Sequence, residues 1–367
     1  MSVLHQLAIT YLKNIGPTLA KSLIGQFGNA EKVFDATPSK LLKIQGIGEK
    51  IVKQLNFREA IEKAEKELKF VEQNNIQILF YTDNNYPKRL KNCHDSPILL
   101  FYKGNSDLNA KRIVSIVGTR NATEYGRGLC KQLIEELELL NVLVVSGLAL
   151  GIDGAVHKEC LKRNINTVGV LGHGLDKLYP SQHKQIAEKM IECGGLLSEY
   201  PSGSKPDREN FPQRNRIVAG IADATIVVEA SLKGGALITA EIANSYNRDV
   251  FAFPGRVGDE FSEGCNFLVR NNKAALLSCA ADLTYILGWE DNSLVKQPHE
   301  QLILPLGLTD EEELIYETIR LSNVPISIDD LTLRTQLTTS KLAMNLLNME
   351  MQGLIHSLPG KIFTIGM

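Results

Sequence analysis

The chain has 367 residues, of which 44% are hydrophobic and 22% are charged, and its formal net charge is −2 at pH 7. This composition excludes a disordered or fibrous protein, and the length predicts two or three domains. The longest uncharged apolar stretch, between Glu138 and Asp153, is too short to span a bilayer, and the first residues have no secretory signal pattern, so we expect no membrane association. Six cysteines without C-x-x-C spacing exclude the usual zinc and thioredoxin-like sites and favour a cytoplasmic location.

The N-terminal 72 residues have helical patterning and a net charge of +3. Two short interruptions, at 14–17 and 44–50, each lie between apolar helical runs, which is the layout of helix-hairpin-helix units. Gly46 and Gly48 would let the second hairpin approach a phosphate closely, with the next helix directing its N–H groups at it. This hairpin is the better candidate for DNA contact, because the first contains Pro17, which has no N–H. A plain helical bundle with glycine turns is the alternative.

From about residue 76, apolar β-rich runs alternate with helical stretches. We expect strands at 113–117, 142–145, 167–171, 225–229 and 250–253. We expect helices between them, at 125–139, 152–163, 182–192 and 236–246. Residues 73–290, whose net charge is zero, are therefore predicted to form a doubly wound α/β domain of largely parallel strands. Ligands of such sheets bind at the carboxyl ends of the strands.

The C-terminal part is predicted to be a linker at 291–308 followed by an acidic domain at 309–367. Thr309 begins a helix with acidic residues in its first turn, and helices at 327–336 and 339–351 precede a terminal hairpin, which is a winged-helix pattern. The segment from 291 onward has a net charge of −5, and Lys341 is the one cation of the expected recognition helix. Since binding phosphates requires cations, we predict a protein-contact or structural role for this domain.

Glycine-rich turns follow several of the expected strands and would present backbone N–H groups to an anion. Because the carboxyl ends of parallel strands meet at one edge of a sheet, these turns should converge on one site. The turn at 146–154 is neither a Walker A motif nor a dinucleotide-binding fingerprint. The candidate anion-binding residues of these turns are Gly118, Thr119, Arg120, Gly147, Gly174, Lys177, Gly234, Gly235 and Thr239.

Two residues near these turns have ordinary structural interpretations. Asp153 lies in the turn at 146–154 and could cap the helix that follows. His173 has no nucleophile or metal ligand at a suitable spacing, so a backbone contact is favoured over a catalytic role.

The stretch 205–217 combines four cations with one aromatic ring, a mixture that suits single-stranded nucleic acid. Arg214 and Arg216 cannot share one helix face at a spacing of two, and we predict that Arg214 points inward as part of a structural ion pair. A salt-bridged loop with Phe211 in the core is the alternative. The predicted DNA contacts of this stretch are Arg208, Phe211, Asn215 and Arg216.

Taken in order, these motifs closely resemble those of the DNA processing protein A family, also called DprA or Smf. The resemblance covers essentially the whole chain. It implies a Rossmann-like core flanked by a helical N-terminal domain and a C-terminal winged helix. The motifs that carry it are Gly118-Thr119-Arg120, 146–153, Gly174-Leu175-Asp176, Tyr179-Pro180, Ser198-Glu199-Tyr200-Pro201, 211–217, 234–240, Pro254-Gly255 and Gly264-Cys265-Asn266.

The resemblance implies a non-catalytic protein without cofactor or metal. Such a protein binds and protects incoming single-stranded DNA, dimerises through its core, and loads the RecA recombinase in natural transformation. It further implies that Arg120 contacts a phosphate, Phe211 meets a base and Arg208 contacts DNA. The chain departs from the family pattern in three places: Thr119 and Gly234 stand where serine is common, and Asn272-Lys273 replaces a more usual Gly-Ala.

An enzymatic alternative is a nucleoside-monophosphate phosphoribohydrolase of the lysine-decarboxylase-like group, which carries P-G-G-x-G-T-x-x-E. Gly234, Gly235 and Glu241 align with that motif, but Leu237 and Ile238 replace its inner Gly-Thr. The replacement removes the phosphate-binding turn that the chemistry requires. A pure protein scaffold is a third possibility, which the cations of the predicted site argue against.

Overall fold

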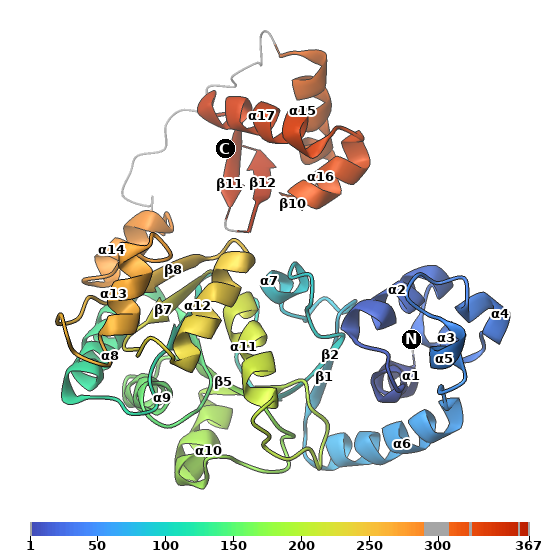
Figure 1. The fold of residues 1–367 in the computed structure, drawn as a ribbon, viewed down its shortest axis with the longest axis horizontal. Coiled ribbons are helices and arrows are strands. Elements are labelled where there is room, and N and C mark those ends of the chain that lie inside the picture. The colour runs from blue at the N-terminus through green and yellow to red at the C-terminus, as the bar shows by residue number, and fades with distance from the viewer. Residues whose placement is uncertain (1, 290–307, 323–324, 359, 366–367) are drawn as a thin grey trace. The chain divides into compact units, whose positions relative to one another are not determined.

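The computed structural model describes residues 2–289, 308–322, 325–358 and 360–365, and divides into two compact units, 1–280 and 281–367 (Figure 1). The predicted linker at 291–308 lies outside the described residues except for Leu308. Within the described ranges, no helix has the length and apolar character needed to cross a membrane. All six cysteines are free thiols.

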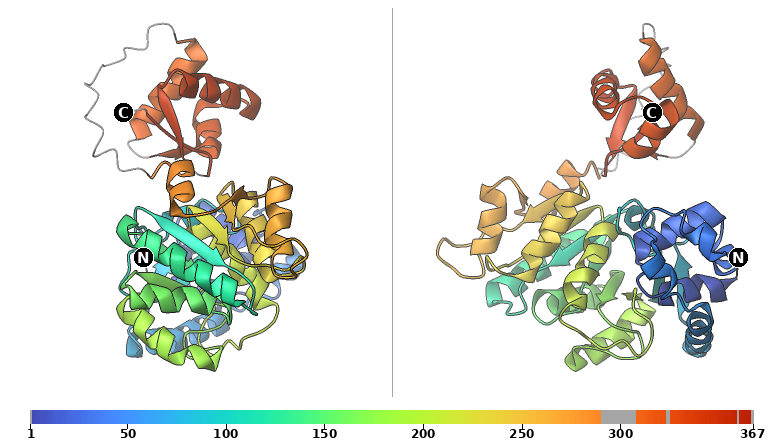
Figure 2. Two further views of the ribbon diagram at one scale, coloured as in Figure 1. Left: turned by 90° about the vertical axis from the view of Figure 1, so that its left-hand side faces the viewer. Right: turned by 45° about the vertical axis from the view of Figure 1, so that its right-hand side comes forward.

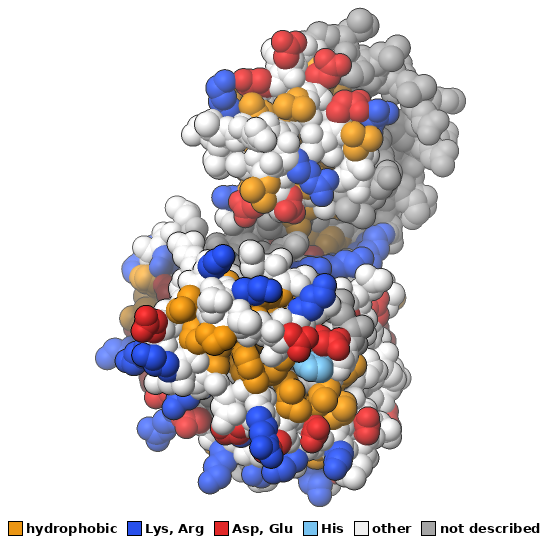
Figure 3. All heavy atoms as spheres, turned by 90° about the vertical axis from the view of Figure 1, so that its right-hand side faces the viewer, with side chains coloured by type: hydrophobic (Ala, Val, Ile, Leu, Met, Phe, Trp, Pro, Cys, Tyr) orange, Lys and Arg blue, Asp and Glu red, His pale blue; other side chains and the backbone are white. Residues whose placement is uncertain are grey.

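The first unit begins with the helical domain predicted from the sequence. Its helices are α1 (Val3–Ala8), α2 (Pro17–Phe27), α3 (Ala30–Phe34), α4 (Pro38–Leu41), α5 (Glu49–Val52) and α6 (Phe57–Gln73), with a 3₁₀ turn η1 (Ile9–Tyr11). Pro17 occupies the first position of α2, where its missing N–H costs nothing, and Gly46 has a positive φ of 89° in the second hairpin. Hydrophobic side chains also gather on the surface of this domain (Figure 3).

The helical domain and the sheet share one apolar core. Its buried residues include Leu7 and Leu23 of the helices together with Phe80, Leu99 and Phe101 of the first two strands. Because this packing is continuous, the helical domain and the α/β domain form a single compact unit although the chain changes its pattern near residue 76.

A nine-stranded sheet forms the centre of the first unit, in the order β1-β2-β6-β5-β4-β3-β7-β8-β9. Strands β3 to β9 are parallel where they pair, whereas β2 is antiparallel to both β1 and β6. The strands are β1 (Gln77–Phe80), β2 (Leu99–Gly104), β3 (Ile113–Val117), β4 (Leu143–Ser146), β5 (Thr167–Leu171), β6 (Gly194–Ser198), β7 (Ala224–Val227), β8 (Asp249–Ala252) and β9 (Ala275–Leu276). The doubly wound prediction is confirmed.

The strands that the sequence did not indicate are β1, β2, β6 and β9. Strand β6 starts with Gly194 and Gly195, which weaken a strand signal. Side chains at these positions would collide with Thr167 and with the ring of Tyr102, so the glycines serve close packing within the sheet.

The sheet has helices on both faces. Helices α8, α9 and α10 stack in chain order on one face, while α11 and α12 pack together on the other (Figure 2). These and the remaining helices of the α/β domain are α7 (Lys88–Lys91), α8 (Glu124–Leu137), α9 (Ile152–Lys162), α10 (Lys184–Glu192), α11 (Asn210–Ile221), α12 (Gly235–Ser245) and α13 (Glu263–Arg270), with 3₁₀ turns η2 (Glu138–Leu140) and η3 (Ser181–His183). Helix α14 (Ala280–Ile286) starts at the last residue of the first unit, and the rest of it belongs to the second. Helix α11 carries Arg214 and Arg216, two of the four cations of the stretch at 205–217.

The second unit has the winged-helix pattern that the sequence predicted. Its helices are α15 (Asp310–Ser322), α16 (Ile328–Thr335) and α17 (Thr339–Met351), and its strands β10 (Ile326–Ser327), β11 (Ile355–Leu358) and β12 (Ile362–Ile365) pair in the order β10-β12-β11. Thr309 and Glu312 bond reciprocally at the start of α15, with the Thr309 N–H donating to the carboxylate at 2.9 Å. The second unit has an apolar core of its own, which includes Ile315, Leu342 and Leu346.

Candidate functional site

A cavity of about 800 Å³ opens at the carboxyl ends of β3, β4 and β7. The chain leaves β3 toward β4 and leaves β7 toward β8 on the opposite side, so the cavity lies at the topological switch point of the sheet. Sequence reasoning placed thirteen residues at one site, and ten of them line this cavity: Gly118, Thr119, Arg120, Gly147, Arg208, Phe211, Asn215, Gly234, Gly235 and Thr239.

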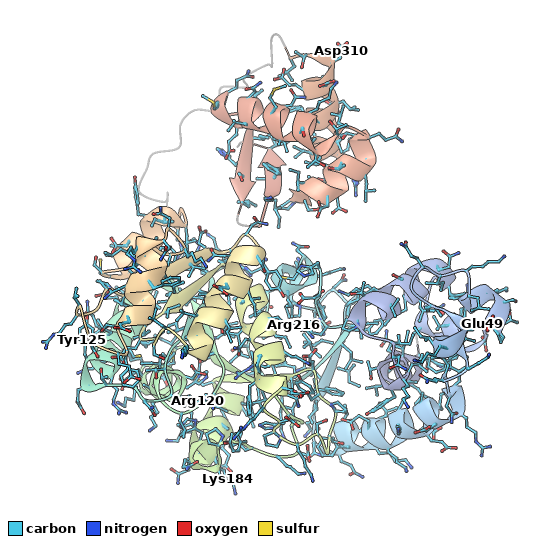
Figure 4. All side chains as sticks on the ribbon, in the orientation of Figure 1. Glu49, Arg120, Tyr125, Lys184, Arg216 and Asp310 are labelled. Atoms are coloured by element: carbon cyan, nitrogen blue, oxygen red, sulfur yellow. The ribbon has the colours of Figure 1, made fainter. Side chains whose placement is uncertain are left out.

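The loop after β3 is anchored by hydrogen bonds to Glu229, a buried residue that was not among the predicted site residues. The backbone carbonyl of Glu229 accepts the Thr119 N–H at 2.8 Å, and its carboxylate accepts both the N–H (3.0 Å) and the hydroxyl of Thr123. A side chain at Gly118 would collide with Ile152 at the start of α9. These contacts fix the loop while Arg120 stays exposed at the cavity (Figure 4).

Two aromatic rings and one guanidinium form a platform beside this loop. The guanidinium carbon of Arg120 lies 5.5 Å from the ring centroid of Phe211, and the ring of Tyr179 lies 6.0 Å from Phe211 at an interplanar angle of 41°. Tyr179 is half exposed and lines the cavity, although it is not among the contacts predicted from the sequence. The sequence signal that could have found it is an aromatic residue two positions after Lys177, in a turn that follows a parallel strand. The platform offers a flat surface on which a base could stack.

Arg214 points inward, as predicted. It is 4% exposed, and its Nη1 donates to the carbonyl of Val170 at 2.6 Å. Burial lowers the pKa of Arg214 and raises the pKa of Asp153, and the opposite charge of each residue counteracts the shift of the other. A side chain at Gly147 would collide with both, so this glycine lets the two charges pack beneath the cavity.

The interpretation of Asp153 as a helix cap is wrong. Gly151 occupies the N-cap position of α9, and the Asp153 carboxylate accepts the N–H of Ala149 at 3.3 Å, in the loop before the helix. Its role is to hold the turn at 146–154. His173 is buried and its Nδ1 lies 2.9 Å from the carbonyl of Gly174, which confirms the backbone contact.

The structure places Gly174, Lys177 and Arg216 outside the cavity lining. Arg216 lies on α11 but forms an ion pair with Glu199 and donates to the carbonyl of Asp95 at 2.8 Å (Figure 4). Burial raises the pKa of Glu199, and the charge of Arg216 opposes that rise. The guanidinium of Arg216 is therefore engaged inside the protein.

Gly174 and Lys177 belong to the loop after β5. Gly174 packs against Pro201 and Ser202, and its N–H faces the carbonyl of Ser204 at 3.4 Å. Lys177 is half exposed, with its Nζ 3.9 Å from Asp176. Gly174 and Lys177 therefore lie behind the cavity wall, to which this loop contributes Tyr179.

The geometry argues against the enzymatic alternative. Glu241, which aligned with the acid of the phosphoribohydrolase motif, lies on an exposed part of α12 and pairs with Lys273 at 3.0 Å. It does not line the cavity. In the described part of the chain, no group of three or more metal-ligating side chains comes together.

Three segments of the chain match known families, in the order helix-hairpin-helix, α/β core and winged helix. Residues 77–288 match the family model of DNA recombination-mediator protein A, residues 304–361 match the DprA winged helix domain, and residues 8–57 match a SAM-like helix-hairpin-helix tandem. Protein Smf of Synechocystis is 35% identical over 97% of this chain and 97% of its own length. The family resemblance and the fold class inferred from the motifs are thereby confirmed.

Two solved structures are similar to the chain. The X-ray structure of DNA processing protein A from Streptococcus pneumoniae has a TM-score of 0.67 and 32% sequence identity, and the match covers 78% of this chain and 98% of that one. The corresponding protein from Helicobacter pylori has a TM-score of 0.53 and 29% identity over 58% of this chain and 95% of that one, and its structure concerns the single-stranded DNA binding mode of that protein.

Proposed function

Because this chain belongs to the DNA recombination-mediator protein A family, we propose that its cavity binds single-stranded DNA. The members of this family are DNA-binding mediators, not enzymes. The observation that carries the proposal is the meeting of exposed cations, an aromatic platform and glycine turns in one cavity at the switch point of the sheet.

Each part of the cavity has a distinct role in this proposal. Arg120 and Arg208 neutralise phosphates, and the first turn of α12, beginning at Gly235, presents its N–H groups to the same backbone. Phe211 and Tyr179 stack on bases, which gives affinity without a sequence preference because every base has a flat face. Such a site favours unpaired strands, whose bases are free to stack.

Mobility shifts with oligo-dT and with duplex DNA of equal length test this proposal. We expect tighter binding of the single strand. Arg120→Ala should weaken it several-fold and reduce the slope of log affinity against log salt by about one, because one phosphate contact is lost. The control is Arg270→Ala, which removes an exposed arginine that does not line the cavity. Unchanged affinity and slope in Arg120→Ala would place the site elsewhere.

The larger role of the chain is proposed on family membership. We propose that it protects incoming single-stranded DNA, forms a homodimer through its core, and loads RecA during natural transformation. Sedimentation of the purified chain tests the dimer. Assembly of RecA on strands already covered by single-stranded DNA-binding protein tests loading, with the Arg120→Ala variant as the comparison.

For the winged helix we propose a protein contact. The surface of α17 opposite its buried residues carries Met344, Leu347 and Met351, all exposed. These residues recur at helical spacing and leave that face without a charge, which suits a protein partner better than a phosphate backbone. For the second helix-hairpin-helix unit, contact with DNA stays a prediction.

A further inference from the structure

The loop at 199–209, between β6 and α11, carries part of the cavity wall. Pro206 and Arg208 line the cavity, and the loop leads directly to Phe211 in the first turn of α11. The hydrogen bonds of 205–209 are local: Glu209 N–H donates to Asp207, and the other bonds of this segment end at Asn210. In the described part of the chain, Arg208 has no side-chain partner. Its position therefore depends on what fixes the first half of the loop.

Within the α/β domain, the ion pair of Glu199 with Arg216 and the bond from the Gly174 N–H to the Ser204 carbonyl hold that half. A buried carboxylate of the helical domain holds it from outside the α/β domain. Glu67 lies on α6 and is 4% exposed. Its Oε1 accepts the N–H of Ser202 at 2.9 Å, and its Oε2 accepts the hydroxyl of Ser202 at 2.6 Å. Two bonds to one ionised group are strong and fix orientation as well as distance. They link residues that are 135 positions apart in the sequence.

The helical domain holds Glu67 itself in place. Tyr11 of the helical domain lies beside the same carboxylate, and burial together with the charge of Glu67 raises the pKa of Tyr11. Leu175, in the loop after β5, packs against the apolar core that the helical domain shares with the first strands. The helical domain thus bonds to the loop at 199–209, and the core that it shares with the first strands also packs against the loop after β5.

We propose that Glu67 is a positioning residue through which the helical domain sets the affinity for single-stranded DNA. It holds the loop at 199–209 so that Arg208 and Phe211 face the cavity, and it does not touch the DNA. The inference rests on the proposed function of the cavity.

Electrostatics and positioning predict opposite effects for the removal of this acid. Loss of a negative charge from a protein that binds a polyanion raises affinity if the charge acts only through the field. Loss of the Ser202 anchor lowers affinity, because the loop must then be ordered when DNA binds. The sign of the change therefore distinguishes the two explanations.

The test measures oligo-dT affinity of the full chain for Glu67→Ala against Glu65→Ala, an exposed acid on the same helix. We expect Glu67→Ala to weaken binding roughly tenfold, within the range of typical coupling energies, and Glu65→Ala to leave it unchanged or slightly stronger. Glu67→Gln should bind nearly as wild type, because an amide can accept the Ser202 N–H and donate to its hydroxyl oxygen. Ser202→Ala keeps the N–H bond, and we expect a loss of about two- to threefold.

Double-mutant cycles show whether the effect passes through the loop. In an Arg208→Ala background, the loss caused by Glu67→Ala should shrink, because the displaced contact is already missing. In an Arg120→Ala background more of the loss should persist than in Arg208→Ala, because Arg120 lies on another loop and meets this segment only at the Phe211 ring. Ser202→Ala provides the same cycle if Glu67→Ala fails to fold.

Two results would overturn the inference. One is a response of Glu67→Ala equal to that of Glu65→Ala. The other is full additivity of Glu67→Ala, or of Ser202→Ala in its place, with Arg208→Ala. If either is found while Arg120→Ala still weakens binding, the proposed function stands and only the role of Glu67 fails. If the wild type does not bind oligo-dT, the proposed function fails and this inference falls with it.

Discussion

The cavity of the α/β domain and the outer face of α17 show how differently two candidate DNA surfaces can be built. At the cavity, Arg120 and Arg208 are exposed next to an aromatic platform. On α17, the face opposite the buried residues of the helix carries exposed apolar side chains such as Leu347. A winged helix usually reads DNA with this helix, so the motif and the surface chemistry disagree.

Net charge does not explain this difference. Residues 73–290 have no net charge, yet folding places cations from two separate loops at one cavity. The segment from 291 onward has a net charge of −5, and its one cation on α17, Lys341, pairs with Glu311 at 2.6 Å. Phosphate binding thus depends on where cations converge and on whether they are already paired within the protein.

The largest effect should come from an arginine of the α/β domain that is already paired. Arg216→Ala leaves the buried carboxylate of Glu199 without its partner, and we expect a loss of about 3–5 kcal/mol in the free energy of unfolding. Denaturant titration measures it, with Arg208→Ala, an exposed arginine, as the control. If stability is unchanged and the salt slope of DNA binding falls instead, Arg216 is a DNA contact, as the sequence suggested.

The next effect concerns the aromatic platform. Phe211→Ala should weaken oligo-dT binding by about 1–3 kcal/mol, the usual contribution of one stacked base. Phe211→Tyr keeps the ring and should retain most of the affinity. Fluorescence anisotropy at fixed salt measures both variants. Equal loss in the two would show that the ring does not stack on a base.

The winged helix is expected to bind single-stranded DNA only weakly. The isolated fragment 305–367 has its own core, and we expect it to bind single-stranded DNA no more tightly than about 10⁻⁶ M at physiological salt, the upper range of non-specific binding. A mobility shift over a salt series measures this. Sub-micromolar binding would remove the contrast between the two regions.

The smallest effect is expected on α17. Leu347 is 57% exposed, and Leu347→Ala should change the stability of the winged helix by no more than about 0.5 kcal/mol. Leu346→Ala is the matched control, because Leu346 is 2% exposed and its truncation should cost about 2–5 kcal/mol. Thermal unfolding of the fragment compares them. A large loss in Leu347→Ala would mean that this face already packs inside the protein.

The elements best predicted from the sequence are those with a strong local signal. The strands β3 and β5 and the helix α17 have the predicted boundaries, because continuous apolar runs and helical periodicity depend on neighbouring residues alone. The convergence of the glycine turns also followed from the sequence, since parallel strands end at one edge. Strand β6 was missed because its two leading glycines weaken the local signal, and the antiparallel β1 and β2 were missed because they lie outside the alternation of parallel strands and helices.

The sequence by itself determined the three-part organisation and most of the cavity wall. Only the tertiary structure decided which cations reach the cavity. Arg120 remains exposed there. Arg216 instead forms an ion pair with Glu199 and donates to the carbonyl of Asp95, and the N–H of Ser202 donates to Glu67. The physical reason is that each of these partners lies far away along the chain or on another element, so that only packing brings the charges and donors within hydrogen-bonding distance.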